Sequence, residues 1–196
     1  MKCPVLLRQF RFHGRGGQGA VIGAELLAKA AFIDGKWSQA FPFFGAERRG
    51  APVKAFTRIS DHEIFSRSQI YDPDYLIVLD SKLLQTIDVL DGLKPDGMIV
   101  INTRKKPEEF GFERKVATVN ATDIALRFGL LLSGLPVVNT AMLGALSKAT
   151  KEISLDSICR AIIEEWPRKA GELNVASAKM AYENTLLGER REVSAK

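Results

Sequence analysis

Three glycines near the start of the chain have the spacing of an anion-binding turn. Gly14, Gly16 and Gly19 fit the pattern GxGxxG, between an apolar strand pattern and a helical one. Glycines in such a turn let backbone N–H groups approach a phosphate, and the N-terminus of the next helix adds partial positive charge. Arg15 would add a full charge. The segment could therefore bind a phosphate-bearing ligand. The alternative is a tight strand-to-helix turn without a ligand.

The motif does not fit the two commonest nucleotide-binding patterns completely. A Rossmann dinucleotide site has an acidic residue roughly 20 positions on, at the end of the second strand. No acidic residue occurs from Gln39 to Gly45, and Glu47 comes late. A P-loop would have Lys where Ala20 stands. A nicotinamide dinucleotide is therefore poorly supported.

A second unusual segment runs from Gln39 to Pro52 and combines aromatic and basic residues. Three phenylalanines precede Arg48 and Arg49, and glycines flank the arginines. Exposed aromatic residues beside arginine are typical of protein interfaces, and paired arginines suit phosphate or carboxylate. The segment from Phe41 to Pro52 is therefore expected to face a partner subunit or a ligand. In the alternative, its phenylalanines pack into the core.

The apolar periodicity predicts the elements that position these residues. A half-buried strand is expected at Arg8–His13, followed by a helix whose buried face carries Ile22, Leu26, Ala30 and Ile33. Two antiparallel strands follow, and Pro42 places the first at a sheet edge. Three buried strands joined by helical crossovers come next, which favours parallel pairing. The expected strands after the first are Ser38–Phe44, Val53–Ile59, Leu76–Leu79, Met98–Ile101 and Val116–Val119.

Polar residues follow each of the three buried strands. They are Asp80 and Ser81, then Asn102 and Thr103, then Asn120, Thr122 and Asp123. Open α/β sheets bind ligands at the carboxyl ends of their strands, but the same residue types also cap helices. From Val138 onward only helices are expected, over Val138–Lys148, Asp156–Trp166 and Glu172–Leu187. The predicted fold is a single-domain α/β protein over 1–196, with a Rossmann-like three-layer mixed sheet, a β-hairpin insertion and a helical C-terminal part. Residues 188–196 are expected to fray.

Composition excludes several classes of protein. Of 196 residues, 46% are hydrophobic, which is typical of a packed chain. No apolar run approaches the roughly 18 residues that span a membrane, so a cytoplasmic protein is expected. Cys3 and Cys159 form no CxxC pair and are too few for an iron–sulfur cluster, which takes about four thiolates. His13 and His62 have no metal-ligand spacing, and a structural role is expected for both. The net charge of +5 fits anionic ligands or acidic partner surfaces.

Several blocks along the chain closely resemble the gamma subunit of pyruvate:ferredoxin oxidoreductases. They span nearly the whole chain in order, and the block 41–52 is most similar to the pyruvate group. Related subunits serve 2-oxoisovalerate, 2-oxoglutarate and indolepyruvate enzymes. The matching blocks are His13–Ala20, Gln39–Pro42, Gly45–Pro52, Pro73–Asp74, Asn120–Asp123 and Asn139–Ala145.

The resemblance implies a required, non-catalytic subunit of a pyruvate synthase that is inactive alone. The enzyme converts pyruvate and CoA to acetyl-CoA and CO₂ and reduces ferredoxin. The partners implied are alpha, beta and delta-type subunits, which would carry thiamine diphosphate, Mg²⁺ and 4Fe–4S clusters. This chain would bind no cofactor except CoA, and Gly-Asp-Gly of a thiamine diphosphate site is absent from it. The residues expected to contact CoA are Gly14, Arg15, Gly16, Gly17, Gln18, Gly19, Arg48 and Arg49. For Arg48 and Arg49, contact with a partner subunit is the alternative.

Three other functions are weighed. The chain could be the equivalent subunit of a 2-oxoisovalerate or 2-oxoglutarate:ferredoxin oxidoreductase, since the motifs are less specific for substrate than for family. It could be a free-standing NAD(P)-binding dehydrogenase, against which the missing acidic residue counts. A nucleic-acid-binding protein is disfavoured, because neither a recognised motif nor a dense Lys/Arg stripe is present. No membrane partner is expected.

Overall fold

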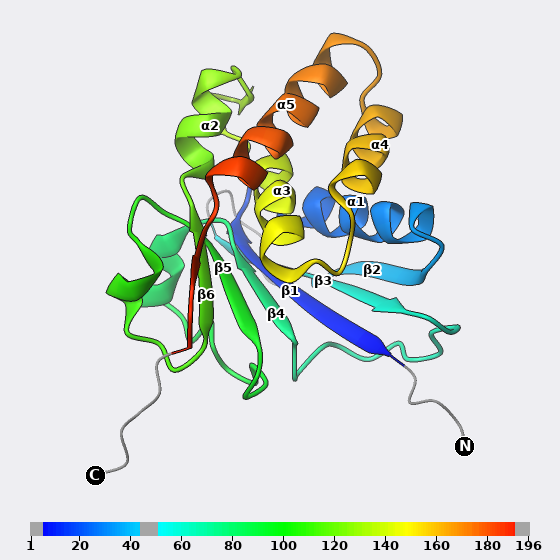
Figure 1. Ribbon diagram of the computed structural model, residues 1–196, viewed down its shortest axis with the longest axis vertical. Coiled ribbons are helices and arrows are strands. Elements are labelled where there is room, and N and C mark those ends of the chain that lie inside the picture. Colours follow the sequence, from blue (N-terminus) through cyan, green and yellow to red (C-terminus); the bar gives the residue numbers. More distant parts are fainter. Residues whose placement is uncertain (1–5, 44–50, 191–196) are drawn as a thin grey trace.

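The computed structural model describes residues 6–43 and 51–190 and contains a mixed seven-stranded sheet in this part of the chain (Figure 1). The strand order is β2-β3-β1-β4-β5-β6-β9. Strands β1, β4, β5 and β6 run parallel, so their carboxyl ends share one edge of the sheet. The strands are β1 (Leu7–Arg15), β2 (Trp37–Phe43), β3 (Pro52–Ser60), β4 (Tyr75–Val78), β5 (Met98–Asn102), β6 (Lys115–Val119) and β9 (Leu186–Gly188).

The predicted hairpin insertion and edge strand are confirmed. β2 pairs antiparallel with β3, and β3 pairs antiparallel with β1, with Leu7 opposite Ser60 and Arg15 opposite Pro52. β2 forms one edge of the sheet, where the missing N–H of Pro42 leaves no central ladder bond unmade. Phe44, the last residue of the expected strand, lies outside the described residues.

The prediction that helical crossovers join the parallel strands is wrong for β4, β5 and β6. β4 leads to β5, and β5 to β6, through loops that carry only short 3-10 helices, at Ser81–Gln85 and Pro107–Phe110. Gly92 explains part of this. Its φ is +70°, and a side chain there would run into the backbone carbonyl of Tyr71. These loops lie on the face opposite the α-helices, where Leu83, Val89 and Leu93 pack against β4 and β5.

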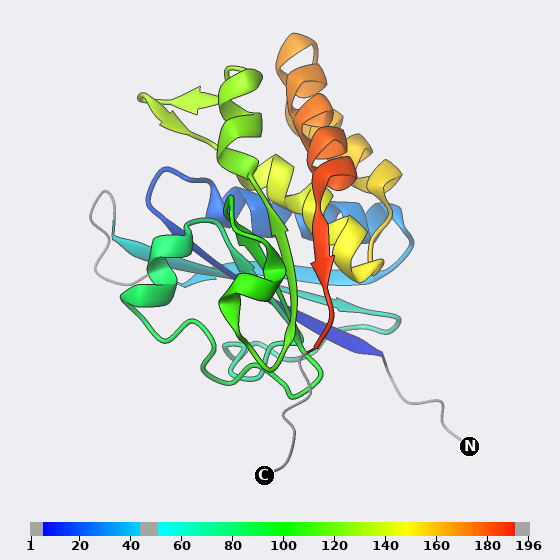
Figure 2. The ribbon, with the colours of Figure 1, turned by 60° about the vertical axis from the view of Figure 1, so that its left-hand side comes forward.

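The α-helices lie together on one face of the sheet, as Figures 1 and 2 show. They are α1 (Ala20–Ile33), α2 (Ala121–Arg127), α3 (Asn139–Thr150), α4 (Leu155–Glu165) and α5 (Lys169–Asn184). The main core forms between these helices and the residues of the strands that face them, such as Phe10, Phe12, Ile77 and Val100. None of the described helices is long and apolar enough to cross a membrane.

The buried face of α1 differs from the predicted one. Ile22 is 39% exposed, whereas Gly23, Ala24 and Leu27 are buried beside the expected Leu26 and Ala30. Small residues allow the helix to lie close to the sheet. A Cβ on Gly23 would already be 3.5 Å from the ring of Phe12. Close approach therefore selects the face with small side chains over the face with the larger aliphatic ones.

The prediction that only helices follow Val138 is wrong at the C-terminal end of the described residues. α5 ends at Asn184, and Leu186 to Gly188 form β9, which pairs antiparallel with β6. The strand occupies the otherwise open edge of β6, so a long-range pairing overrides the local helical pattern. Gly188 therefore lies in the sheet opposite Val116, and residues 191–196 lie outside the described residues.

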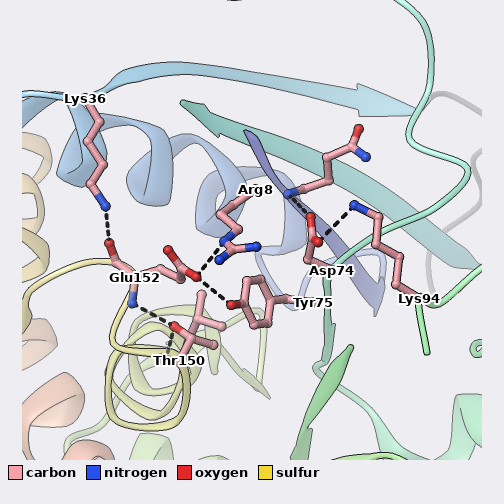
Figure 3. Close-up of polar contacts among 9 residues, drawn as sticks. Arg8, Lys36, Asp74, Tyr75, Lys94, Thr150 and Glu152 are labelled. Carbon is pink, nitrogen blue, oxygen red and sulfur yellow. Dashed lines mark hydrogen bonds and ion pairs between the residues drawn. The ribbon is translucent and has the colours of Figure 1, made fainter. Parts of the chain in front are cut away.

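Glu152, in the segment between α3 and α4, ties the helices to the amino edge of the sheet (Figure 3). Its Oε1 accepts a hydrogen bond of 2.6 Å from the phenol of Tyr75 and lies 2.9 Å from Arg8 Nε. Its backbone carbonyl accepts a hydrogen bond of 2.7 Å from Lys36 Nζ. Burial and the hydrogen bond to Glu152 raise the pKa of Tyr75, so its phenol stays protonated as a donor. This edge lies opposite the glycine turn.

Candidate anion-binding site at the glycine turn

The glycine motif forms the connection between β1 and α1. Gly17 and Gly19 have φ of +97° and +81°, the left-handed region that favours glycine. Three amides of the turn are used within the chain. Arg15 donates to the side-chain carbonyl of Gln18 at 2.8 Å, Gln18 donates to the Arg15 carbonyl at 3.0 Å, and Gly16 donates to the Ala51 carbonyl at 3.2 Å.

The N–H groups of Gly17 and Gly19 form no hydrogen bond with any described residue. The motif therefore offers fewer free donors than its glycine content suggests.

Two helix N-termini meet at this turn. α1 begins after Gly19 and α3 after Val138, and both lack a side-chain cap and an acidic residue in the first turn. Asn139, the first residue of α3, lies against Gly19, because a Cβ on Gly19 would be 2.6 Å from Asn139 Nδ2. Uncapped helix N-termini carry partial positive charge. The junction is therefore electrostatically suited to an anion.

Asn139 also carries an unsatisfied donor at the junction. Its side chain is 2% exposed, and its Oδ1 accepts a hydrogen bond of 2.9 Å from the Thr140 amide. Its Nδ2 has no hydrogen-bond partner among the described residues. Sequence reasoning placed Asn139 in a family block but could not place it beside Gly19, which is distant in the chain.

A hollow of about 460 Å³ opens beside the turn. The Arg15 guanidinium pairs with Asp80, with Nε and Oδ2 2.7 Å apart, so its charge is partly matched. Lys82 forms no ion pair with any described carboxylate. The hollow thus combines Arg15, which is paired with Asp80, with Lys82, which is not paired with a described carboxylate, and with the backbone of the glycine turn. It is lined by Arg15, Gly16, Gln18, Asp80, Lys82, Leu135 and Pro136.

The polar residues after β5 and β6 hold the sheet and α2 together. Asn102 Nδ2 donates hydrogen bonds to the Leu79 carbonyl at 2.8 Å and to Thr122 Oγ1 at 2.9 Å. Its Oδ1 accepts a hydrogen bond of 3.1 Å from the Thr122 amide. Asn120 caps α2 by accepting from the Asp123 amide. The capping that the sequence allows for these residues is thus present at Asn120.

A second hollow, of about 400 Å³, lies at the ends of β5 and β6, the edge of the sheet where the sequence leaves a ligand site open as the alternative to helix capping. Three basic side chains line it, with an apolar part contributed by β6, α2 and α5. The Arg104 guanidinium donates to Asp123 at 2.7 Å, and this hydrogen bond lowers the pKa of Asp123. The consecutive Arg104 and Lys105 after a buried strand were the available signal. The hollow is lined by Thr103, Arg104, Lys105, Thr118, Val119, Asn120, Asp123, Ile124, Arg127, Met180, Asn184 and Leu186.

His13 precedes the turn but contributes no charge to it. It is buried, and burial, with Arg11 and Lys54 nearby, lowers its pKa to about 3. Its Nε2 accepts a hydrogen bond of 3.0 Å from Arg11, whose guanidinium also donates to the carbonyl of Val89 at 3.0 Å. These contacts fit the expected structural role. Within the described residues, no group of three or more His, Cys, Asp and Glu could hold a metal ion.

Arg48 and Arg49 lie outside the described residues, so the structure does not test their role. The described part of their segment is partly packed. The Phe41 ring stacks on Phe56 with centroids 5.2 Å apart, and the Phe43 ring meets Phe56 edge-on at 6.5 Å. Phe43 remains 40% exposed. Packing into the core therefore applies to Phe41 more than to Phe43.

Comparison with known proteins agrees with this architecture and with the motifs. The family described as pyruvate ferredoxin/flavodoxin oxidoreductase matches residues 9–184. The pyruvate synthase subunit PorC of Methanothermobacter thermautotrophicus is 55% identical over 175 residues, 89% of this chain and 94% of that protein. The common gamma subunit of the pyruvate/ketoisovalerate oxidoreductases of Pyrococcus furiosus is 50% identical over 182 residues, 90% of this chain and 96% of that one.

A solved structure extends the comparison to the fold. The crystal structure of the pyruvate oxidoreductase subunit PORC from Thermotoga maritima has a TM-score of 0.81 at 36% identity, covering 93% of this chain and 99% of that one. The resemblance inferred from the motifs is thus confirmed. The chain belongs to the pyruvate ferredoxin/flavodoxin oxidoreductase family, as a chain of its gamma-subunit type.

Proposed function

We propose that this chain is the gamma subunit of a pyruvate synthase that, with alpha, beta and delta-type subunits, converts pyruvate and CoA to acetyl-CoA and CO₂ and reduces ferredoxin. The observation that carries the proposal is its 50–55% identity to pyruvate synthase and common gamma subunits over nearly their full length. The relatives named for both pyruvate and ketoisovalerate oxidoreductases favour a second candidate, the gamma subunit of a 2-oxoisovalerate enzyme.

Thiamine diphosphate, Mg²⁺ and the iron–sulfur clusters belong on the partner subunits in this proposal. The chain has two cysteines, whereas a 4Fe–4S cluster takes about four thiolates. The electron-transfer route to ferredoxin therefore runs through other chains. The part left to the gamma chain is to bind and orient a substrate.

We place the phosphate end of CoA at the glycine-turn hollow. Gly16 and Gln18 of the turn line this hollow, and the adjoining free N–H groups of Gly17 and Gly19, with the uncapped N-terminus of α1, would hold an anion at its edge. Lys82 and Arg15 would add charge at the wall of the hollow. CoA supplies the thiol that takes the acyl group, and the chain's own residues fix where its phosphates lie.

Reconstitution of the complex tests both parts of this proposal. The isolated chain should be colourless and should not reduce a viologen dye with pyruvate, whereas adding it to the other subunits should restore CoA-dependent activity. Pyruvate-dependent dye reduction by the purified chain alone would contradict a partner-borne cofactor set. Failure of the complete set to turn over pyruvate, with turnover of 2-oxoisovalerate, would support the second candidate.

Gly17→Val tests the CoA placement. A Cβ on Gly17 would meet only Leu135 Cδ1, at 3.9 Å, and Leu135 lines the hollow, so we expect the valine side chain to reach its edge. The KM for CoA should rise about tenfold, equivalent to about 1.4 kcal/mol of lost binding, while the KM for pyruvate changes less than twofold. The matched control is Gly35→Val, which has a similar φ of +75° and open space but lies at the far end of α1. An unchanged KM for CoA in a folded Gly17→Val enzyme would contradict the placement.

A further inference from the structure

A short apolar hairpin projects from the body of the molecule beside the glycine turn. Strands β7 (Leu131–Leu132) and β8 (Leu135–Pro136) form a separate two-stranded sheet. Figure 2 shows it, in light green, extending away from α2. Leu131, Leu132 and Leu135 are 51%, 58% and 43% exposed, and none of them belongs to the buried clusters. An isolated two-stranded hairpin gains little stability from its own packing, so these leucines are not placed there for the fold.

The hairpin is nevertheless held in one conformation. Ser133 and Gly134 have φ of +50° and +79°, the positive values of a type I′ turn. The twist of this turn matches the twist of paired strands. At its base, the Val137 amide donates to the Leu130 carbonyl, and the Leu130 amide donates to the Ala125 carbonyl, both at 2.9 Å. A projection ordered before binding loses little conformational entropy when a partner covers it.

The border of the hairpin carries a positive charge. Lys82 lines the same hollow as Leu135 and forms no ion pair with a described carboxylate. Asp80, which lines this hollow too, is already paired with Arg15. The patch therefore has an apolar centre and a cation at its border, which favours a partner surface that carries a carboxylate.

We propose that the hairpin Leu131–Pro136 docks into an apolar cleft, with a carboxylate at its border, on another subunit of the oxidoreductase. The proposal rests on the proposed function as a subunit. Because Leu135 and Pro136 also line the glycine-turn hollow, the docked subunit borders that hollow. A second copy of this chain fits the patch less well, since two such hairpins would bring Lys82 near the same cation of the other copy.

The test measures binding of the gamma chain to the purified subcomplex of the alpha, beta and delta-type subunits. Leu131→Ser with Leu135→Ser should raise the dissociation constant at least tenfold and leave the melting temperature of the isolated chain within about 2 °C. The control is Phe32→Ser, which removes a side chain that is 76% exposed at the far end of α1. It should change binding less than twofold. Lys82→Glu should also weaken binding. The loss should be smaller at 0.5 M NaCl, where charge interactions at an exposed border are screened.

Three results would overturn the proposal, and they are distinguishable. If the leucine variant binds the subcomplex as the parent does, the hairpin is not the docking element, although the subunit function stands. If the parent chain fails to bind the subcomplex at all, the proposed function fails with it. If sedimentation shows a dimer of the isolated chain that the leucine variant abolishes, the occupant is a second copy of this chain.

Discussion

Gly17 and Gly19 both adopt left-handed backbone in one turn, but the molecule requires them for different reasons. At Gly17 an added Cβ would have only Leu135 Cδ1 within 4 Å, at 3.9 Å. At Gly19 a Cβ would lie 2.6 Å from Asn139 Nδ2 and 3.2 Å from Asn139 Cβ. Gly19 is therefore needed to pack α1 against α3, whereas Gly17 is not crowded by a neighbouring side chain.

Gly19→Ala should destabilise the chain more than backbone strain alone predicts. A non-glycine residue at positive φ costs about 1 kcal/mol, and displacing the buried Asn139 should bring the loss to roughly 2–3 kcal/mol. The measurement is the free energy of unfolding from urea titrations. Gly35→Ala supplies the strain alone, because its φ is +75° and nothing lies within 4 Å of the added Cβ.

Adding Asn139→Ala tests whether the clash is the cause. If it is, the double variant should lose less stability than the sum of the two single variants, because removing the amide relieves the contact. Additive losses, or equal losses for Gly19→Ala and Gly35→Ala, would refute the packing role of Gly19.

At the scale of elements, the end of α1 is joined to the start of α4 through one carboxylate. Asp34 accepts hydrogen bonds from the Ser154 amide at 2.9 Å, from Ser154 Oγ at 3.0 Å and from the Ser157 hydroxyl. Burial alone would raise the pKa of Asp34, but the hydrogen bonds from Ser157 and Ser154, with Lys36, outweigh burial and lower it. The ionised form is therefore favoured in the folded state.

The junction should contribute a pH-dependent part of the stability. A carboxyl whose folded pKa is below its unfolded value of about 3.9 stabilises the fold above that pH and loses this contribution as the pH falls through the folded pKa. Asp34→Asn should cost about 1 kcal/mol at pH 7, and the difference from the parent should shrink below about pH 4. Urea unfolding at pH 7 and pH 3 measures it, with Asp61→Asn as the control. A difference that is the same at both pH values would contradict the role of the ionised carboxylate.

The elements that the sequence predicts well are those determined by local patterns. Alternating Phe10 and Phe12 identify β1, and Pro42 with a short connection identifies the antiparallel β2–β3 pair. β9 was missed because Leu186 and Leu187 continue a helical pattern, and only the distant edge of β6 turns them into a strand. The β7–β8 hairpin did have a local signal, since Ser133-Gly134 is a turn dipeptide between leucine pairs.

The segment with Arg48 and Arg49 remains a prediction at this scale. We expect it to serve assembly rather than CoA, because aromatic residues beside arginines are the composition of an interface. Arg48→Ala with Arg49→Ala should then reduce co-purification of the other subunits and leave the melting temperature of the isolated chain unchanged. Arg67→Ala with Arg160→Ala removes the same charge from two exposed positions as a control. Normal assembly with a raised KM for CoA would instead assign the arginines to CoA.

At the scale of the whole molecule, the carboxyl edge of the sheet gathers basic side chains. Lys82 lines both the glycine-turn hollow and a neighbouring hollow of about 240 Å³, and Lys105 lines that one and the hollow at β5 and β6. The sequence gives a net charge of only +5, spread along the chain, and cannot show this gathering. It arises because parallel strands end at one edge, so residues that follow separate strands become neighbours.

A chain that binds CoA and not the oxoacid could serve enzymes for different oxoacids, because CoA is common to them. The Pyrococcus and Thermococcus relatives are named as subunits common to pyruvate and ketoisovalerate oxidoreductases. We therefore expect Gly17→Val to raise the KM for CoA by the same factor whether the chain is assembled with pyruvate-type or ketoisovalerate-type partners. The KM for each oxoacid and the preference between the two should follow the partners and stay within twofold of the parent. Steady-state kinetics of both assemblies, with Gly35→Val as control, would measure this. A shift in either oxoacid KM would show that the glycine turn acts on the oxoacid site, and the separation of roles between the subunits would then be wrong.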